Sequence, residues 1–187
     1  MPLSCDFFEK QSSDKGKETC FNARMETTEK AFIALVKAYE RIIYKVCYLY
    51  ATPGVTLEDL YQEVVVNLWK GYSRFRGECK ESTWVYRIAL NTCISFLRKE
   101  KSAPTFVELT AQIDRLDEDD ETQQMLRRLY QLIGRLNQLE KSLILLYLED
   151  KSYDEMAEIT GLTQTNVATK LSRIKEKLRQ MNREDEG

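Results

Sequence analysis

The chain has 187 residues, with 28 Lys plus Arg, 30 Asp plus Glu and no His, so its formal net charge is −2. Its hydrophobic content of 43% excludes a disordered tail, and its length fits one domain or two small ones. No apolar run approaches the roughly 18 residues that span a bilayer, and no signal-peptide pattern opens the chain. We therefore expect a cytoplasmic protein without membrane insertion.

Signatures of catalysis and metal binding are missing. Without His, the commonest general base and the Ser/His and Cys/His dyads are excluded, and no glycine-rich phosphate loop occurs. The five cysteines form no CxxC pair, so we expect reduced thiols at Cys5, Cys20, Cys47, Cys79 and Cys93. The sequence predicts a protein that is not an enzyme and holds no cofactor or metal.

The seven Gly and three Pro are few for this length, which favours long helices. Residues 1–24 show no periodicity, so we expect disorder there. A helical pattern starts just after Met25, which raises the hypothesis that Met25 is the native start. The first helix is predicted from Thr27 or Thr28 to about Leu49.

Pro53-Gly54 predicts a turn, and Thr56 with Asp59 resembles a capping box that opens a second helix. Its apolar stripe is expected to be buried and consists of Leu57, Leu60, Tyr61, Val64, Leu68 and Trp69. A second face is polar with one apolar member and consists of Asp59, Gln62, Glu63 and Val66. That face suits a protein contact, although plain solvent exposure explains it as well.

A basic, loop-like segment over residues 71–82 leads to a third helix near Thr83. Trp84 falls on the apolar stripe of this helix and is expected in the core, whereas Arg87, Asn91 and Arg98 lie along another side. By spacing alone, that side could be an ordinary solvated surface.

Charge is unevenly distributed along the chain. Residues 70–101 contain eight Lys or Arg and three Glu, which gives +5. Residues 102–122 contain seven Asp or Glu and one Arg, which gives −6 and predicts an acidic linker. The near-neutral net charge of the chain therefore results from basic and acidic segments whose charges cancel.

Helical periodicity returns at Gln123, and residues 139–148 form a strongly apolar helix. Ser152 can cap a short helix over residues 153–160, Gly161 can make a turn, and Thr163 can cap a last helix from Gln164 to about Asn182. Helix, short turn and helix is the layout of a helix-turn-helix motif.

The last helix carries polar side chains outside its apolar stripe, near its start, where a recognition helix meets base edges. Gln and Asn can pair with adenine, Arg with guanine, and Lys and Thr with phosphates or bases. These side chains are Gln164, Thr165, Asn166, Thr169, Lys170 and Arg173. Residues 163–183 hold six basic residues and one acidic residue, so a second segment with a charge of +5 is predicted to bind DNA.

Several motifs occur in an order that resembles a known family. The N-terminal ones are EDLYQEV at 58–64, Leu68-Trp69, Phe75-Arg76-Gly77, TWVYRIALN at 83–91 and Leu-Arg-Lys at 97–99. The C-terminal ones are Leu139, Tyr147-Leu148-Glu149, residues 153–159, Asn166-Val167, Leu171, Arg173 and Leu178. Over residues 30–178 the chain resembles bacterial RNA polymerase sigma factors of the extracytoplasmic-function (ECF) group. Thr165-Asn166, in place of the common Gly-Thr, is similar to factors of Bacteroides-type bacteria.

The resemblance implies an all-α fold of two small helical domains joined by an acidic linker, the second a helix-turn-helix. Their bounds would be 1–24 for an N-terminal extension, 25–101 for the first domain, 102–122 for the linker and 123–187 for the second domain. The partners would be core RNA polymerase, promoter DNA and an anti-sigma factor. The linker would enter polymerase channels that otherwise hold nucleic acid.

The resemblance also implies roles for particular residues. The face with Asp59, Gln62, Glu63 and Val66 would bind the clamp helices of the polymerase. The minus-ten element would be recognised, with a base flipped out of the duplex, by Arg76, Gly77, Glu78, Cys79, Lys80, Arg87, Asn91 and Arg98. The minus-thirty-five element would be read by Thr163, Gln164, Thr165, Asn166, Thr169, Lys170 and Arg173.

Two other classes of function stay open on the sequence. A standalone helix-turn-helix regulator would bind an operator without polymerase, using its N-terminal helices to sense a ligand or to dimerise. A helical adaptor would bind proteins without contacting DNA.

Overall fold

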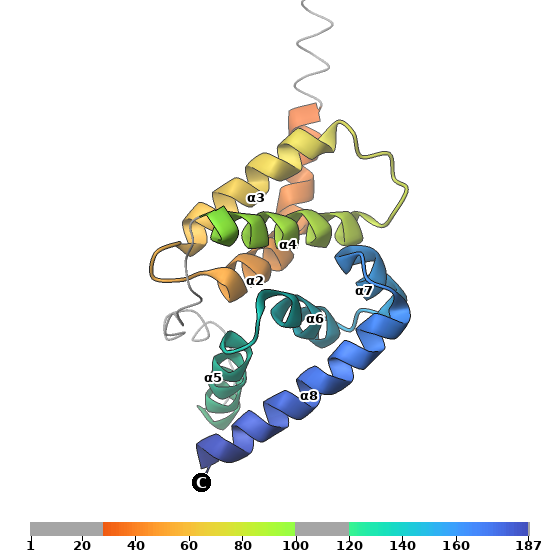
Figure 1. Ribbon diagram of the computed structural model, residues 1–187. Helices are drawn as coiled ribbons and strands as arrows, with labels where there is room; N and C mark the ends of the chain where they lie inside the picture. The colour runs from red at the N-terminus through yellow and green to blue at the C-terminus, as the bar shows by residue number, and fades with distance from the viewer. Residues whose placement is uncertain (1–27, 100–119, 187) are drawn as a thin grey trace, which may run out of the picture. The chain divides into compact units, whose positions relative to one another are not determined.

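Residues 28–99 and 120–186 are described by the computed structural model (Figure 1), and their regular structure is helical apart from an isolated bridge between Thr52 and Val55. The labelled helices are α2 (Glu40–Tyr50), α3 (Leu57–Tyr72), α4 (Glu81–Lys99), α5 (Asp120–Gly134), α6 (Gln138–Leu148), α7 (Tyr153–Thr160) and α8 (Gln164–Glu186). The predicted all-α class is confirmed. The disorder expected over residues 1–24, and nearly all of the predicted linker, lie outside the described residues.

The chain divides into two compact units, Met1–Glu40 and Arg41–Gly187. In the first unit, residues 28–38 are helical and bury Phe32 and Leu35. The sequence predicts one helix as far as Leu49, but the structure has a turn at Tyr39, whose N–H still donates to Leu35 O at 3.1 Å. The prediction of a continuous helix was wrong here, because no Gly or Pro between residues 28 and 50 signals the interruption.

In the second unit, α3 packs against α4. The predicted stripe of α3 is buried at Leu60, Val64 and Leu68, each fully. Three members of the stripe depart from the prediction, because Trp69 is 39% exposed and Leu57 and Tyr61 are only half-buried. Trp84 is half-buried instead of fully buried, with its ring centroid 4.9 Å from that of Phe75.

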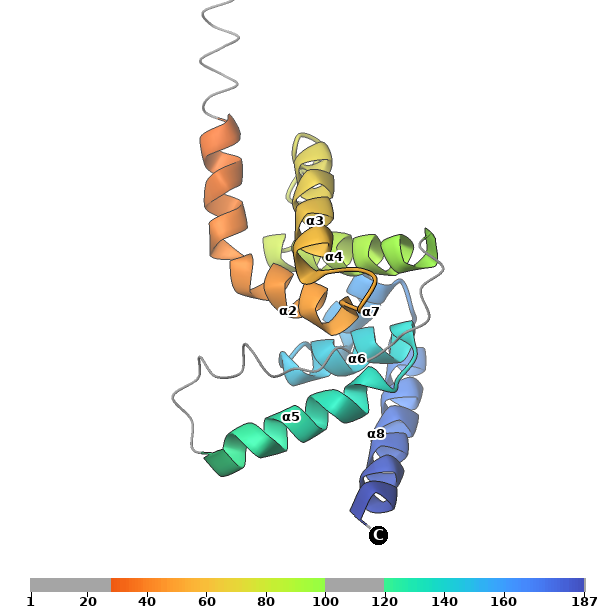
Figure 2. The same cartoon turned by 90° about the vertical axis from the view of Figure 1, so that its left-hand side faces the viewer.

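The helices of the C-terminal part are arranged around α6, which packs against α5, α7 and α8 (Figure 2). Every residue from Lys141 to Leu146 is buried. Burial lowers the pKa of the Lys141 ammonium, because desolvation penalises the charged form. Since α6 is covered on nearly all sides, its position fixes those of the helices around it.

Three helices begin with reciprocal hydrogen bonds between a capping side chain and the third helical residue. The pairs are Thr56 with Asp59, Asn137 with Glu140, and Ser152 with Glu155. Each pair satisfies two backbone N–H groups that the helix itself leaves without partners. The predicted caps at Thr56 and Ser152 are confirmed, whereas that at Asn137 was not recognised in the sequence.

A buried hydroxyl group links α2 to α6. The Tyr50 hydroxyl donates to Gln138 O at 2.6 Å and lies 2.6 Å from Ser142 Oγ. Burial raises the pKa of this phenol, so it remains protonated and able to donate. The bond therefore contributes to holding the N-terminal helices of this unit on its C-terminal helices.

Replacing Tyr50 with Phe is expected to lower the free energy of unfolding by about 1 to 2 kcal/mol, because buried acceptors lose their donor. Chemical denaturation measures this difference. Tyr153→Phe is the control, since Tyr153 is 38% exposed and its change should stay within about 0.5 kcal/mol. Equal effects of the two variants would contradict a structural role for the Tyr50 hydroxyl.

Candidate nucleic-acid and protein interfaces

The helix-turn-helix motif consists of α7 and α8, and the turn between them lies where the sequence predicts it (Figure 1). Gly161 adopts the left-handed conformation, with φ +73°, and its N–H donates to Ala157 O at 2.9 Å. Thr163 Oγ1 then accepts the N–H of Asn166 at 3.3 Å, which caps the start of α8. A turn of this geometry suits Gly, because a positive φ causes steric strain in residues that have a Cβ atom.

One side of α8 is buried and the other is exposed. Val167, Leu171 and Ile174 are buried. All the residues predicted to read the minus-thirty-five element are exposed, namely Thr163, Gln164, Thr165, Asn166, Thr169, Lys170 and Arg173. The first turns of α8 therefore present a continuous polar and basic row to the solvent.

Farther along α8, basic side chains contact the protein's own residues. Lys175 Nζ lies 3.6 Å from the centroid of the Tyr147 ring, and Lys177 pairs with Glu140 at 2.9 Å. The charge of +5 counted over residues 163–183 thus overstates what this helix offers to DNA. Lys170 and Arg173, on the exposed row, are the better placed cations.

The predicted protein-binding face of α3 is accessible, but its two carboxylates also accept hydrogen bonds within the protein. Asp59 and Gln62 are exposed, and Val66 is 43% exposed. Asp59 accepts the hydroxyl of Thr56 at 2.7 Å, while Glu63 is half-buried and accepts from Asn67 at 3.3 Å. Trp69 follows Val66 by one helical turn and adds an exposed aromatic surface that sequence reasoning had assigned to the core.

The residues predicted to bind the minus-ten element fall on the loop before α4 and along α4 itself. In the loop, Arg76, Gly77, Glu78 and Lys80 are exposed and Cys79 is half-buried. Gly77 has φ +72°, with nothing within 4 Å of an added Cβ, so backbone conformation favours glycine there. On α4, Asn91 and Arg98 are exposed and Arg87 is half-buried.

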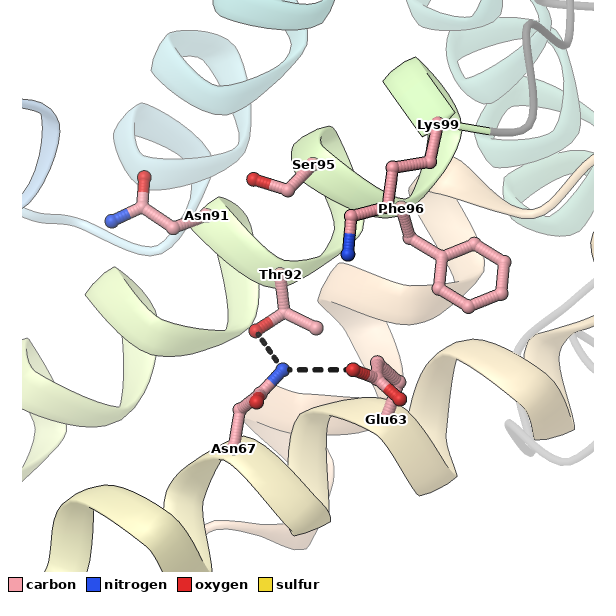
Figure 3. A pocket seen from close by; sticks show the side chains of 7 residues that line it. All are labelled: Glu63, Asn67, Asn91, Thr92, Ser95, Phe96 and Lys99. Carbon is pink, nitrogen blue, oxygen red and sulfur yellow. Dashed lines mark hydrogen bonds between the residues drawn. The ribbon is translucent and has the colours of Figure 1, made fainter.

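A hollow of about 210 Å³ lies between α3 and α4, and Figure 3 shows the side chains that line it. The side-chain amide of Asn67 links the two helices here, because it donates to Glu63 Oε1 on α3 and to Thr92 Oγ1 on α4, both at 3.3 Å. The other lining residues are Asn91, Ser95, Phe96 and Lys99. The hollow thus joins a residue of the predicted protein-binding face to one of the predicted DNA-binding side.

Two of the predicted DNA-binding cations contact α7. Lys80 Nζ lies 2.8 Å from Glu155 Oε1, and Arg87 Nη2 donates to Glu158 O at 2.7 Å. The hydrogen bond from Lys80 lowers the pKa of the Glu155 carboxyl group to about 2, helped by the backbone N–H of Ser152. That carboxylate is therefore ionised at neutral pH.

The part of the chain that the structure describes shows neither a metal-binding cluster nor a membrane-spanning helix. Within residues 28–99 and 120–186, no group of His, Cys, Asp or Glu has an arrangement that could hold a metal ion. In the same ranges, no helix is long and apolar enough to cross a membrane. Cys47, Cys79 and Cys93 are free thiols.

Comparison with known proteins matches two family models in sequence order. Sigma-70 region 2 matches residues 35–103, and Sigma-70 region 4 matches residues 126–178. RNA polymerase sigma factor SigV of Bacillus subtilis is 26% identical over 87% of this chain and 98% of its own. RNA polymerase sigma factor YlaC of the same organism is 30% identical over 66% of this chain and 76% of its own.

Solved structures show the same fold. CnrH, in complex with the cytosolic domain of CnrY, superposes with a TM-score of 0.61 at 20% identity, covering 84% of this chain and 90% of that chain. The sigma factor RpoE of Bartonella quintana, in complex with the anti-sigma factor NepR, gives 0.60 at 19% identity over 83% and 96%. The chain belongs to the ECF group of RNA polymerase sigma factors. It directs RNA polymerase to specific promoters.

Proposed function

We propose that this sigma factor uses three surfaces, one for core RNA polymerase and two for promoter DNA, and that it performs no chemistry of its own. Its place of action would be the cytoplasm, where bacterial polymerase works. The domains would be residues 25–101 and 123–187, with residues 102–122 between them. The observation that carries the proposal is the exposed row on α8, which starts directly after the Gly161 turn.

The row on α8 would read the minus-thirty-five element in the major groove. Gln164 and Asn166 have amide groups suited to adenine, and Arg173 has the paired donors suited to guanine or phosphate. Thr163 would help to fix the N-terminal end of the helix, whose backbone N–H groups favour phosphate oxygens.

The loop before α4, with the exposed side of α4, would bind the minus-ten element as it melts. Arg76, Lys80 and Arg98 are exposed cations that can follow a single-strand backbone. The hollow beside Asn91 is our candidate for the site of a flipped base, because it offers amide and hydroxyl groups next to Phe96.

Asn91→Ala in the full-length factor, assembled with core polymerase, is expected to reduce promoter opening about tenfold, the cost of one lost base contact. Fluorescence of 2-aminopurine in the minus-ten element measures opening. The variant should bind core polymerase as the parent chain does. Normal opening would remove Asn91 from the proposed site.

The exposed face of α3 would dock on the polymerase, with Val66 and Trp69 supplying apolar area among polar groups. The relatives CnrH and RpoE were solved with bound partner chains, and RpoE's partner is an anti-sigma factor. We propose that an anti-sigma factor binds this chain as well.

Run-off transcription on genomic fragments with core polymerase tests the proposal as a whole. Transcripts with defined starts should appear only when the protein is added. Tight operator binding by the protein alone, without polymerase-dependent transcripts, would favour a standalone regulator.

A further inference from the structure

One amide group joins α3 to α4 beside the hollow that we assign to a flipped base (Figure 3). Asn67 Nδ2 donates to Thr92 Oγ1 on α4 and to Glu63 Oε1 one turn earlier on α3, each at 3.3 Å. An amide nitrogen carries two N–H groups, so it can serve both acceptors at once. Because a carboxylate can only accept, the bond to Glu63 also decides which end of the amide is the nitrogen. The side chain of Asn67 is thereby held in one orientation.

The acceptor on α4 is a buried polar group. Thr92 is only 8% exposed, and its bond to Asn67 places it on the side of α4 that faces α3. The two helices pack against each other, and α3 fully buries Leu60, Val64 and Leu68. Apolar packing has no preferred direction, whereas a hydrogen bond weakens outside a narrow range of distance and angle. The bond from Asn67 therefore restricts the rotation of α4 about its own axis.

The rotation of α4 sets the direction in which Asn91 points. Asn91 precedes Thr92 in the chain, and neighbouring residues of an α-helix point about 100° apart. Thr92 faces α3, while Asn91 is exposed at the hollow. Ser95 and Lys99 follow Asn91 at intervals of four residues and line the same hollow. Fixing Thr92 therefore places three polar side chains that a bound base would meet.

We infer that Asn67 is a positioning residue of the minus-ten site, which orients α4 through Thr92 so that Asn91 can meet the flipped base. The inference rests on the proposed function of the hollow. Asn67 belongs to α3 and lies outside the set of residues that the sequence motifs assign to promoter recognition. Functional groups have to be held within about 0.5 Å of their productive geometry. Loss of the bond from Asn67 therefore weakens the contact with the base without removing it.

Asn67→Ala in the full-length factor, assembled with saturating core polymerase, is expected to slow promoter opening about fivefold on the best template, the fold-change of one ordinary hydrogen bond. The templates would be versions of one promoter with A, C, G or T in turn at each minus-ten position. Fluorescence of 2-aminopurine beside the element would report opening. Asn67→Ala should reduce the differences among the four bases at the flipped position. Slowing by the same factor on all four templates would indicate a general loss of stability and would overturn the inference.

Thr92 offers a matched pair of variants. Thr92→Val removes the acceptor at nearly constant volume, whereas Thr92→Ser keeps the hydroxyl group. Thr92→Val should reproduce the loss of base preference, and Thr92→Ser should retain the preference of the parent chain. Opposite behaviour of this pair would contradict a role for the hydroxyl group.

Combining Asn67→Ala with Thr92→Val tests whether the two residues act through one bond. The double variant should slow opening about fivefold, as each single change does, because both changes remove the same interaction. Slowing by the product of the two effects, about twenty-fivefold, would show that the residues act independently. That result would overturn positioning through Thr92.

Tyr50→Phe is the control for stability. It removes a buried hydrogen bond between α2 and α6, and Tyr50 does not line the hollow. Base preference should stay that of the parent chain in this variant. Circular dichroism would establish that every variant is folded at the temperature of the assay.

Failure of the inference differs from failure of the proposed function. If Asn91→Ala slows opening while Asn67→Ala and Thr92→Val keep the base preference of the parent chain, only the positioning role is overturned. If Asn91→Ala opens promoters normally, the hollow is not the base site, and the positioning role of Asn67 fails as well.

Discussion

Charge reversal at Asp59 and Glu63 is expected to weaken binding to core RNA polymerase by about a hundredfold, because placing like charges in an interface costs several kcal/mol. The double variant Asp59→Lys/Glu63→Lys would be titrated against labelled core enzyme. Transcription at saturating sigma factor should recover in part, since the DNA-binding surfaces are intact. Unchanged affinity would leave this face of α3 an ordinary solvated surface.

The variant needs a control for helix capping. The Asp59 carboxylate accepts both the N–H and the hydroxyl of Thr56, so Lys at this position also removes the capping box of α3. Thr56→Ala removes the capping hydroxyl, at a cost of about 1 kcal/mol, and keeps the carboxylate. Polymerase binding should survive in Thr56→Ala if the loss in the double variant comes from the interface.

Asn166→Ala and Arg173→Ala are each expected to reduce transcription from minus-thirty-five-dependent promoters by about tenfold to a hundredfold, the cost of a lost base or phosphate contact. Their affinity for core polymerase should not change. Asn166→Ala should relax the base preference at one promoter position, which a library of randomised minus-thirty-five elements would reveal.

Arg179→Ala is the matched control on the same helix. Arg179 is exposed but lies farther from the start of α8, where it pairs with Glu176 at 3.2 Å. It should transcribe at the level of the parent chain. If Arg173→Ala transcribed as well as Arg179→Ala, the proposal that the exposed row on α8 reads the minus-thirty-five element would be contradicted.

Local signals allowed most helix starts to be predicted from the sequence. Ser152 is followed three residues later by Glu155, which completes a capping box, Thr163 is a residue type that caps helices, and Gly161 can adopt a positive φ at low cost. Such signals are contained within a few consecutive residues, so they do not depend on the rest of the fold. Helices α7 and α8 accordingly begin at the residues that the sequence predicts.

Where the prediction failed, the deciding contacts were distant or ambiguous. Trp69 adjoins Leu68 at the edge of the apolar stripe, and periodicity could not tell that it is 39% exposed. The pairs that Lys80 and Arg87 form with α7 could not be found by counting charges. The net charge of each segment does not tell which segments contact one another in the fold. The interruption at Tyr39 has no residue signal that we can identify.

The boundaries of the helix-turn-helix have a consequence for exchanging parts between relatives. Its first helix starts with Ser152 and ends with Gly161, and its second starts with Thr163, all through bonds within the motif. A transplant of residues 152–174 into a related factor would carry its own start and stop signals. The buried side chains of the motif would have to suit the new host, namely Met156, Ile159, Val167, Leu171 and Ile174. Promoter preference could thus be transferred as a cassette.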